Sequence, residues 1–473
     1  MPQLLKRILF AVLGLMGIAL LLFAALSYFV DSHFCKPWLE RVASQTLGME
    51  LRINGPMTIS FFPVIHVRLL DMQIRHRGIE IASGEEVDLK IAPIPLIYRK
   101  LRIKKIGLKG FHSSIDRKCL GALTFEKRKA GKGPFQLLTI DDLSISNGDF
   151  RYKDEKSGET FEVENYSIDV DEFLIKRGDR TRLLERLTFT GEFACSEIRA
   201  KGVLFSDVTF TCKGKEGRIL FNPVTTRLFG GQGSGRLEID FSDPIPRYSI
   251  HATLLKFKIE EYLKKLSFDK AAEGAMDFSA TLSFQGNSLK EMVRTVMGEV
   301  ALAGENLTLH GNDLDRAFVS FESSQNFNLV DTVTFFFAGP LGLVVTAGYK
   351  FLSIFKGAGK SSIQRLFSDW KIHHGKAHAR DVAMSTKQNR VALKGGIDFV
   401  NERFDNVIIA LINDRGCARV RQTVHGPFGK PVVEKPTVLM SVVGLTMNML
   451  EKTRGVFTGE KCEIFYRGSI SAP

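Results

Sequence analysis

Cysteine is scarce in this chain of 473 residues: six are spread thinly along it. No two of them form a C-x-x-C pair and none has metal-ligand spacing, which argues against a zinc or iron–sulfur module. The spacing also excludes a disulfide-rich scaffold. In an oxidising compartment, Cys195 with Cys212 and Cys417 with Cys462 are the candidate disulfide pairs. No metal or other cofactor is expected.

Tryptophan and tyrosine are also rare, with 2 and 8 residues against 37 phenylalanines. Phenylalanine offers apolar area without a polar tip, whereas tyrosine and tryptophan carry a hydrogen-bonding group. The bias therefore suits contact with hydrocarbon better than stacking against sugars.

Charge is absent from one long run, Ile8 to Val30. A helix of this length crosses a hydrocarbon core of ~30 Å. The alternative is a cleavable signal peptide, but the run continues past its weak cut site at Ala25, Leu26 and Ser27. We therefore expect an uncleaved membrane anchor, with Ile8, Leu13, Leu20, Phe23 and Val30 in the bilayer. Lys6 and Arg7 precede it, so the N-terminus is expected in the cytoplasm and the rest of the chain beyond the membrane.

The formal net charge is +13, with basic clusters over residues 99–109 and 127–132. Such clusters bind nucleic acid, anionic lipid headgroups or only water. A translocated chain does not meet nucleic acid, so a solvated face and a headgroup-facing patch are the two interpretations left.

Alternation of apolar and polar residues dominates the chain from Met49 onward and predicts a meander of short antiparallel strands. A short helix over 37–47 precedes them. Turns are expected at Asn54-Gly55, Pro63, Gly78 and Ser83-Gly84. The basic link 126–134 reads as a domain boundary or a long exposed loop.

Helical spacing indicates short helices at 255–266, from Ser288, after Asn312-Asp313 and over 437–450. A second uncharged run, 332–349, contains Gly339 and Pro340, which favour a broken helical hairpin over a second crossing. Such a hairpin would rest on lipid or cap an apolar groove. We expect apolar helices at the far end of the molecule to contain Phe335, Phe336, Leu343, Val438 and Val442.

Four regions follow from these patterns. They are 1–35, with the cytoplasmic N-terminus and anchor; 36–134, a helix and meander; 135–310, a β-groove; and 311–473, with apolar helices and terminal strands.

Sequence motifs for phosphate binding, catalysis or metal binding are weak. "GAGKSS" at 357–362 lacks the first glycine of a phosphate-binding loop, because position 354 is isoleucine, and a flexible linker is favoured. His310 and Asp315 have the H-x4-D spacing of some acyltransferases, but one spacing is weak evidence. His373 and His374 are strand neighbours that point to opposite faces, which disfavours a metal site with His378. No catalytic or metal residues are assigned, and the chain is not expected to be an enzyme.

An amphipathic sheet must hide its apolar face. A second sheet covers that face in a sandwich; in the alternative, a long sheet curls into a trough whose lining contacts acyl chains. Periodicity does not separate the two, although the excess of phenylalanine favours the trough. Its expected lining includes Ile145, Phe189, Phe205, Phe210, Phe221, Phe278 and Phe284.

Several segments resemble the AsmA family of anchored bacterial envelope proteins. They are "LGMELRINGPMTISFFPVIHVRLLDMQI" near the N-terminus and, further on, "VMGEVALAGENLTLHGNDLD", "FNLVDTVTFFFAGPLGLVVTAGYKF", "FSDWKIHHGKAHARDVAMSTKQNRVALKGGIDFVNERFD" and "GEKCEIFYRGSISAP". The similarity is nearly continuous from 274 to 473, whereas 135–250 matches only in strand rhythm.

The resemblance implies a mainly β fold with short helices: an N-terminal transmembrane helix, then an elongated, curled antiparallel sheet forming an apolar groove of the chorein-like lipid-transfer kind. It also implies a bacterial inner-membrane anchor, a periplasmic body and a role in moving phospholipid toward the outer membrane and maintaining that membrane. The expected partners are phospholipid acyl chains, the inner membrane, and outer-membrane or envelope proteins, with no nucleic acid. The alternative is a non-enzymatic periplasmic scaffold that assists outer-membrane protein assembly.

Overall fold

The structure is a computed structural model, and it describes residues 36–37, 40–41, 49–61, 63–76, 78–98, 101–116, 138–155, 157–175, 185, 187–265, 272–311, 313–318, 359–438 and 464–470. Strands make up most of this part, as the alternation predicts, with a few short helices. The chain divides into two compact units, Met1–Phe221 and Asn222–Pro473. Strand β10 (Arg218–Leu228) runs across the division.

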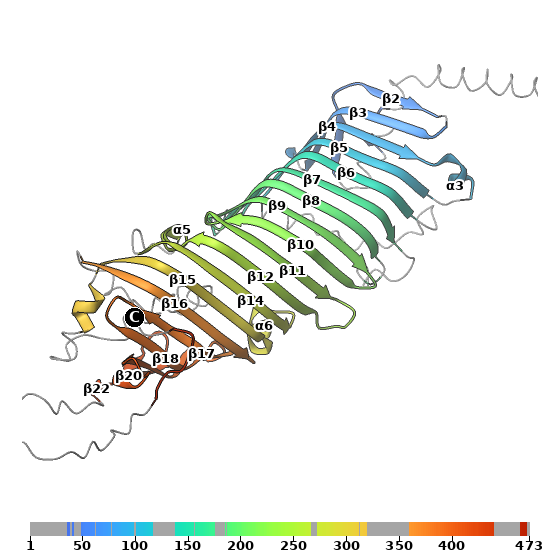
Figure 1. The fold of residues 1–473 in the computed structure, drawn as a ribbon. Coiled ribbons are helices and arrows are strands. Elements are labelled where there is room, and N and C mark those ends of the chain that lie inside the picture. Colours follow the sequence, from blue (N-terminus) through green and yellow to red (C-terminus); the bar gives the residue numbers. More distant parts are fainter. Residues whose placement is uncertain are drawn as a thin grey trace, which may run out of the picture. The chain divides into compact units, whose positions relative to one another are not determined.

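The first unit is a sheet whose strands follow one another in chain order (Figure 1). Strands β1 and β2 both pair with β3, and Asn54-Gly55 forms the expected connection between them. The described elements are β1 (Glu50–Ile53), β2 (Met57–Ser60), β3 (Ile65–His76), β4 (Ile79–Ile91), α3 (Pro93–Ile97), β5 (Leu101–Asp116), β6 (Leu138–Lys153), β7 (Thr160–Ile175), β8 (Leu187–Ala200) and β9 (Val203–Lys215).

One pairing in this sheet differs from the fully antiparallel prediction. Strands β5 and β6 are parallel, with Leu101 opposite Leu138 and Asp116 opposite Lys153. A parallel pair needs a crossover of a dozen or more residues that returns the chain to the same end. The connection between Asp116 and Leu138, which contains the basic link 126–134, is long enough to do this.

The strands are longer than the sequence pattern predicts. Ser83 and Gly84 were expected at a turn, but they lie inside β4 and pair with β3. Asn147 in β6 and Asn165 in β7 have φ of 52° and 49°, and the register of β6 and β7 shifts beside Asn147. Asparagine tolerates this left-handed conformation, so the chain kinks and the strand continues. Several expected short strands therefore merge into strands of up to 16 residues.

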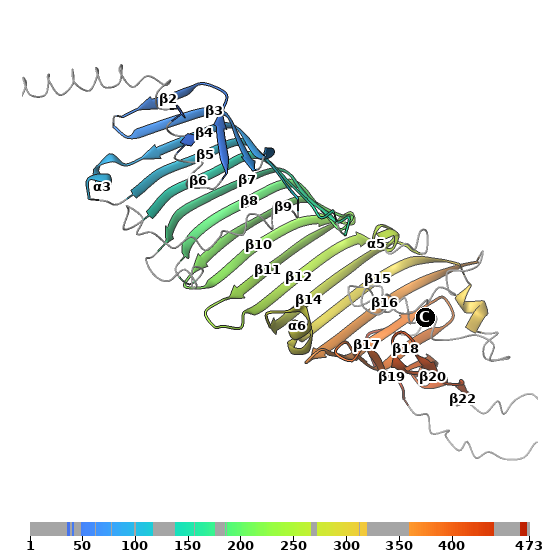
Figure 2. The same cartoon turned by 180° about the vertical axis from the view of Figure 1, so that it is seen from behind.

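The second unit contains the remaining strands, again mostly paired with their chain neighbours (Figure 2). Its elements after β10 are β11 (Gly231–Asp240), β12 (Arg247–Lys258), α5 (Ile259–Lys265), β13 (Ala272–Glu273), β14 (Ala275–Gln285), α6 (Leu289–Thr295), β15 (Met297–Gly311), β16 (Gly359–His373), β17 (Lys376–Ser385), β18 (Arg390–Asp398), β19 (Arg403–Ile412), β20 (Ala418–Pro427), β21 (Val432–Val433) and β22 (Thr437–Val438).

Two short helices of this unit begin where the sequence indicates, and α5 begins later. Ser288 caps α6, and its hydroxyl accepts a hydrogen bond from the Glu291 N–H. Asp313 caps the helical residues 314–318 in the same way through the Arg316 N–H. Helix α5 begins at Ile259, so Leu255 lies in β12 and not in a helix.

The core of the second unit is concentrated at its C-terminal side. Trp370, Phe404 and Phe318 are at most 1% exposed, and they pack with apolar side chains of β14 to β20 and of α5. In the first unit the buried apolar clusters are small, with four and three residues among those described. The second unit therefore has a closed core at its C-terminal side, whereas the first unit leaves most of its apolar side chains half-buried.

The final described segment packs on the second unit. The Tyr466 hydroxyl donates to the Asp381 carboxylate (2.5 Å), and the Arg390 guanidinium donates to the Ile470 carbonyl (2.8 Å). Tyr466 and Ile470 cover a patch of small side chains that includes Ala383, Ala392 and Ala410.

Two expectations at this end differ from the structure. Residues 359–362, expected in a flexible linker, form the start of β16 and pair with β15. Thr437 and Val438, expected to begin a helix, form β22 instead and pair with β20.

The predicted membrane segments lie outside the described residues. None of the described helices has the length and hydrophobicity needed to span a bilayer. The expected anchor residues Ile8 to Val30, and Phe335, Phe336, Leu343 and Val442 of the expected apolar helices, fall in segments that are not described.

Candidate functional site

The strands β11, β12, β14 and β15 carry apolar side chains on one face. Strand register places Leu254 opposite Phe278, Ile250 opposite Leu282, and Tyr248 opposite Phe284. Successive side chains of a strand alternate between faces, so Tyr248, Ile250, Ala252 and Leu254 share one face with Phe278, Ala280, Leu282 and Phe284. The Tyr248 and Phe284 rings stack with centroids 5.0 Å apart.

The other face of the same strands is polar. The Ser234 and Thr253 hydroxyls hydrogen-bond across β11 and β12 (2.7 Å), and His251 hydrogen-bonds to Thr281 across β12 and β14 (2.9 Å). On β11, the Arg236 guanidinium donates to Glu238 (2.9 Å). These side chains are solvated, so the two faces of the sheet differ sharply in polarity.

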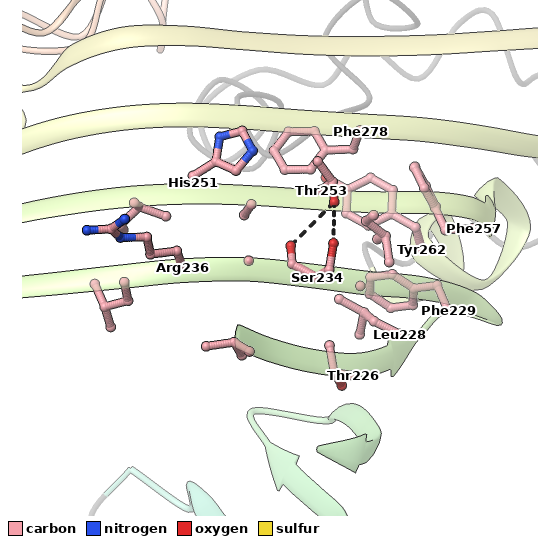
Figure 3. Close-up of a pocket in the computed structure, with 17 residues that line it drawn as sticks. Thr226, Leu228, Phe229, Ser234, Arg236, His251, Thr253, Phe257, Tyr262 and Phe278 are labelled. Carbon is pink, nitrogen blue, oxygen red and sulfur yellow. Dashed lines mark hydrogen bonds between the residues drawn. The ribbon is translucent and has the colours of Figure 1, made fainter. Parts of the chain in front are cut away.

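A cavity of about 320 Å³ lies on the apolar face, over β10, β11 and β12 (Figure 3). Its floor consists of small residues: Gly233 and Gly235 on β11, and Ala252, which lies opposite Gly235 on β12. Side chains of ordinary size at these positions would fill the space, and a Cβ on Gly235 would lie 2.7 Å from the His251 carbonyl oxygen. Leu237 on β11 and Ile250 on β12, which lie opposite each other, also line the cavity.

Aromatic side chains close one end of this cavity (Figure 3). Tyr262 on α5 packs edge-to-face against Phe229 (5.6 Å between ring centroids) and Phe257 (6.4 Å). Phe278 approaches from β14. Burial raises the pKa of the Tyr262 hydroxyl well above its ordinary value, so this end of the cavity is neutral at any physiological pH.

The first unit has a comparable apolar feature, a ladder of aromatic rings across four strands. Tyr166 on β7, Phe193 on β8, Phe210 on β9 and Phe221 on β10 follow one another. The closest rings, Phe193 and Phe210, are stacked with centroids 4.7 Å apart. Phe193 and Phe210 are only partly buried although they pack on the small core cluster of this unit.

The seven predicted lining residues share one property: all are intermediate between buried and exposed. Phe205 and Phe210 join Ile145 around the core cluster of the first unit. Phe189 lies over Gly214, where an added Cβ would be 2.2 Å from its ring. Phe221 contacts Phe210, Phe278 lines the cavity, and Phe284 stacks on Tyr248.

Residues around the cavity that were not predicted as lining include Phe229, Phe257, Tyr262 and Leu254. Alternation alone does not identify Phe229, Phe257 and Tyr262. Phe229 follows the end of β10, Phe257 lies near the end of β12, and Tyr262 belongs to helix α5. The alternating glycines Gly231, Gly233 and Gly235 were the available signal, since glycines that repeat every second residue leave one face of a strand without side chains.

The cysteines divide into two groups. Cys195 and Cys212 are free and buried, and burial raises the pKa of each thiol to about 11. The prediction that they pair is wrong: Cys212 lies opposite Gly191, four residues or roughly 13 Å along β8 from Cys195. Cys417 is disulfide-bonded, and Cys462, its predicted partner, lies outside the described residues.

The residues considered for chemistry have other partners. His310 faces Glu273 (3.1 Å), whereas the Asp315 carboxylate accepts hydrogen bonds from Thr386 and Asn389. The described residues contain no group of three or more His, Cys, Asp or Glu side chains suited to a metal ion.

A sequence profile of the AsmA family matches residues 1–176 and 187–381. The chain belongs to the AsmA family. The match includes the middle region, which resembled the family only in strand rhythm, and it ends before the closing segment that resembled the family closely. Among curated proteins, none shows detectable similarity to this chain.

Proposed function

We propose that this AsmA-family chain holds phospholipid by its acyl chains on the apolar strand faces and moves it between membranes. The observation that carries the proposal is the lining of partly buried phenylalanines, seen in both units. Exposed apolar area costs about 25 cal/mol per Å², so a face of this kind gains stability when hydrocarbon covers it.

The cavity on β10 to β12 fits one part of this task. Its lining surface is almost entirely apolar, although Ser234, Arg236, His251 and Thr253 also border it. Its floor carries no side chain larger than the Ala252 methyl group, and its volume falls at the lower end of the range for ligand pockets, roughly 300 to 1,000 Å³. Each methylene transferred from water contributes about 0.8 kcal/mol, so a short length of acyl chain binds there without polar contacts. No bond is made or broken in this function.

The cellular setting is part of the proposal. The apolar run Ile8–Val30, preceded by Lys6 and Arg7, would anchor the chain in the bacterial inner membrane with its body in the periplasm. Phospholipid would then travel toward the outer membrane, in keeping with the family resemblance. The closed core around Trp370 and Phe404 would give the chain a rigid end.

A scaffold that assists outer-membrane protein assembly is the second candidate. The closed core of β14 to β20 supports it, because a packed module of this kind needs no lipid. The two functions differ in what contacts the partly buried phenylalanines inside the cell.

Photo-crosslinking in cells tests the proposal. A photoreactive residue in place of Phe205 or Phe284 should form adducts with phospholipid. The control is Ser283, which neighbours Phe284 in β14, is exposed and points to the polar face. Phospholipid adducts at Phe205 and Phe284 but not at Ser283 support the proposal; adducts with protein only, at all three positions, support the scaffold.

A further inference from the structure

Helix α3 and the residue that follows it, between β4 and β5, expose two large apolar side chains to solvent. Ile94 and Tyr98 are each 69% exposed. Most large apolar side chains of the first unit are at least half-buried in the sheet. Two exposed apolar side chains within five residues therefore form a small apolar surface patch.

The base of this projection is fixed. Ala92 is buried, and its N–H donates to the Arg102 carbonyl oxygen (3.0 Å), which joins the two ends of the connection. The Tyr98 N–H donates to the Pro95 carbonyl oxygen (3.0 Å). Pro93 and Pro95 have a fixed φ, so little conformational entropy remains to be lost when the projection binds a surface.

The surrounding sequence is strongly basic. From Leu89 to Ile115 the chain has no aspartate or glutamate, but it has seven lysines and arginines: Lys90, Arg99, Lys100, Arg102, Lys104, Lys105 and Lys109. Arg99 and Lys100 follow Tyr98 directly in the sequence.

Some of these cations have carboxylate partners. Lys90 faces Asp88 (3.7 Å), Arg102 faces Asp141 (3.0 Å) and Lys105 faces Asp142 (3.2 Å). Lys104 on β5 is exposed to solvent. The apolar tip of α3 is therefore bordered by positive charge in excess of the nearby acidic side chains.

We propose that residues 93–98 and 102–104, the α3 contact, dock on a membrane surface that carries anionic headgroups. Ile94 and Tyr98 enter the interfacial layer, where tyrosine is favoured because its ring is apolar and its hydroxyl is polar. Arg102 and Lys104, both exposed on β5, then lie at the depth of the lipid phosphates. A partner protein would need a matching acidic groove, whereas an anionic bilayer meets both the apolar and the cationic requirement.

This contact is separate from lipid transport. It would orient the first unit on the membrane whether or not acyl chains occupy the apolar strand faces, and its test does not measure transport.

The test uses the full chain reconstituted in phosphatidylethanolamine vesicles with or without phosphatidylglycerol. A photoreactive residue replaces Ile94, and the adducts are identified by mass spectrometry. The matched control is Ile79, which is also exposed (58%) but lies at the other end of β4, roughly 40 Å away along the strand.

We expect lipid adducts at position 94 in vesicles with phosphatidylglycerol, fewer without it, and none at position 79. Arg102→Gln and Lys104→Gln should lower the adduct yield by up to about fivefold for each cation removed. Glutamine in place of Lys153 and Lys201, at the opposite ends of the strands, should leave it unchanged.

Three results would overturn the proposal. Equal lipid adducts at 94 and 79 would show that the chain meets lipid without orientation. No lipid adduct at 94, with the protein still in the vesicles, would exclude the contact. Adducts with protein at 94 in cells, and none with lipid, would assign α3 to a protein partner.

Discussion

Phe193 and Phe210 face each other across β8 and β9, with ring centroids 4.7 Å apart and an angle of 14° between the ring planes. Both are only partly buried where they pack against the small core cluster of the first unit. Phe193 also contacts Tyr166, and Phe210 also contacts Phe221. These contacts stabilise the sheet, and the part of each ring that stays exposed is available to a ligand.

The loss of unfolding free energy on removing one of these rings measures how exposed the apolar face of the first unit is. Phe210→Ala should lower the free energy of unfolding by about 1 to 2 kcal/mol, from the lost ring contacts and partial burial. Phe404→Ala, at a side chain 1% exposed, should cost about 3 to 5 kcal/mol. Urea denaturation of the two variants provides the comparison, and equal costs would mean that Phe210 is covered in solution.

A charge should be tolerated on the open face but not in the closed core. Phe284→Glu leaves the carboxylate hydrated, so the protein should fold with a melting temperature near that of wild type while binding of acyl chains is lost. Phe404→Glu buries the same charge without a partner and should prevent folding.

Ser283→Glu on the polar face is the control for both variants, and it should change neither melting temperature nor lipid binding. A Phe284→Glu protein that unfolds like Phe404→Glu would contradict an open face.

Filling the cavity should block lipid locally. Gly235 lies opposite Ala252, so Ala252→Leu has room to extend over the floor of the cavity. With a photoreactive residue at position 278, we expect at least a severalfold loss of phospholipid adducts in this variant. Ser249→Leu, on the polar face of the same strand, should leave the adducts unchanged; an equal loss in both would point to a general effect on the sheet.

Asp398 gives the second unit a pH dependence that can be predicted. Burial alone would raise the pKa of its carboxyl group, but hydrogen bonds from Asn401 and Val400 and the charge of Lys376 (3.5 Å) lower it below its ordinary value of 3.8. The ionised carboxylate therefore stabilises the fold above pH 3.8, and this contribution is lost as the pH falls through the lowered pKa.

Asp398→Asn removes the charge that this contribution depends on. Thermal unfolding measured from pH 7 down to pH 2 should show a smaller loss of stability on the acidic side in the variant than in wild type. An unchanged acid profile would mean that the carboxyl group titrates normally.

The sequence predicted the strand character, because alternation reports which side chains share a face. Of its seven predicted lining residues, Phe278 lines the cavity, and lipid contact at all seven stays a prediction. The sequence did not predict that the strands continue through Asn147 and Asn165. Asparagine is common in turns because it tolerates positive φ, so the sequence suggests that a strand ends at each of these residues. It also left the trough and the sandwich open. The difference lies in what covers Phe210 compared with Phe404, and long-range packing of this kind leaves no local pattern.

The cavity was hidden for a related reason. Gly233 and Gly235 read as weak strand positions, and only their register opposite Leu254 and Ala252 shows that they form a floor. The parallel pairing of β5 and β6 was equally invisible, because a long link is compatible with either direction of return.

The central claim is that hydrocarbon of a lipid occupies the apolar strand faces. Mass spectrometry of phospholipid that co-purifies with the chain lacking residues 1–30 tests this most directly, because the apolar N-terminal run is then absent. We predict bound phospholipid that is depleted in Phe284→Glu and retained in Ser283→Glu. Purified protein that is folded, free of phospholipid and unable to take it up from vesicles would contradict the account.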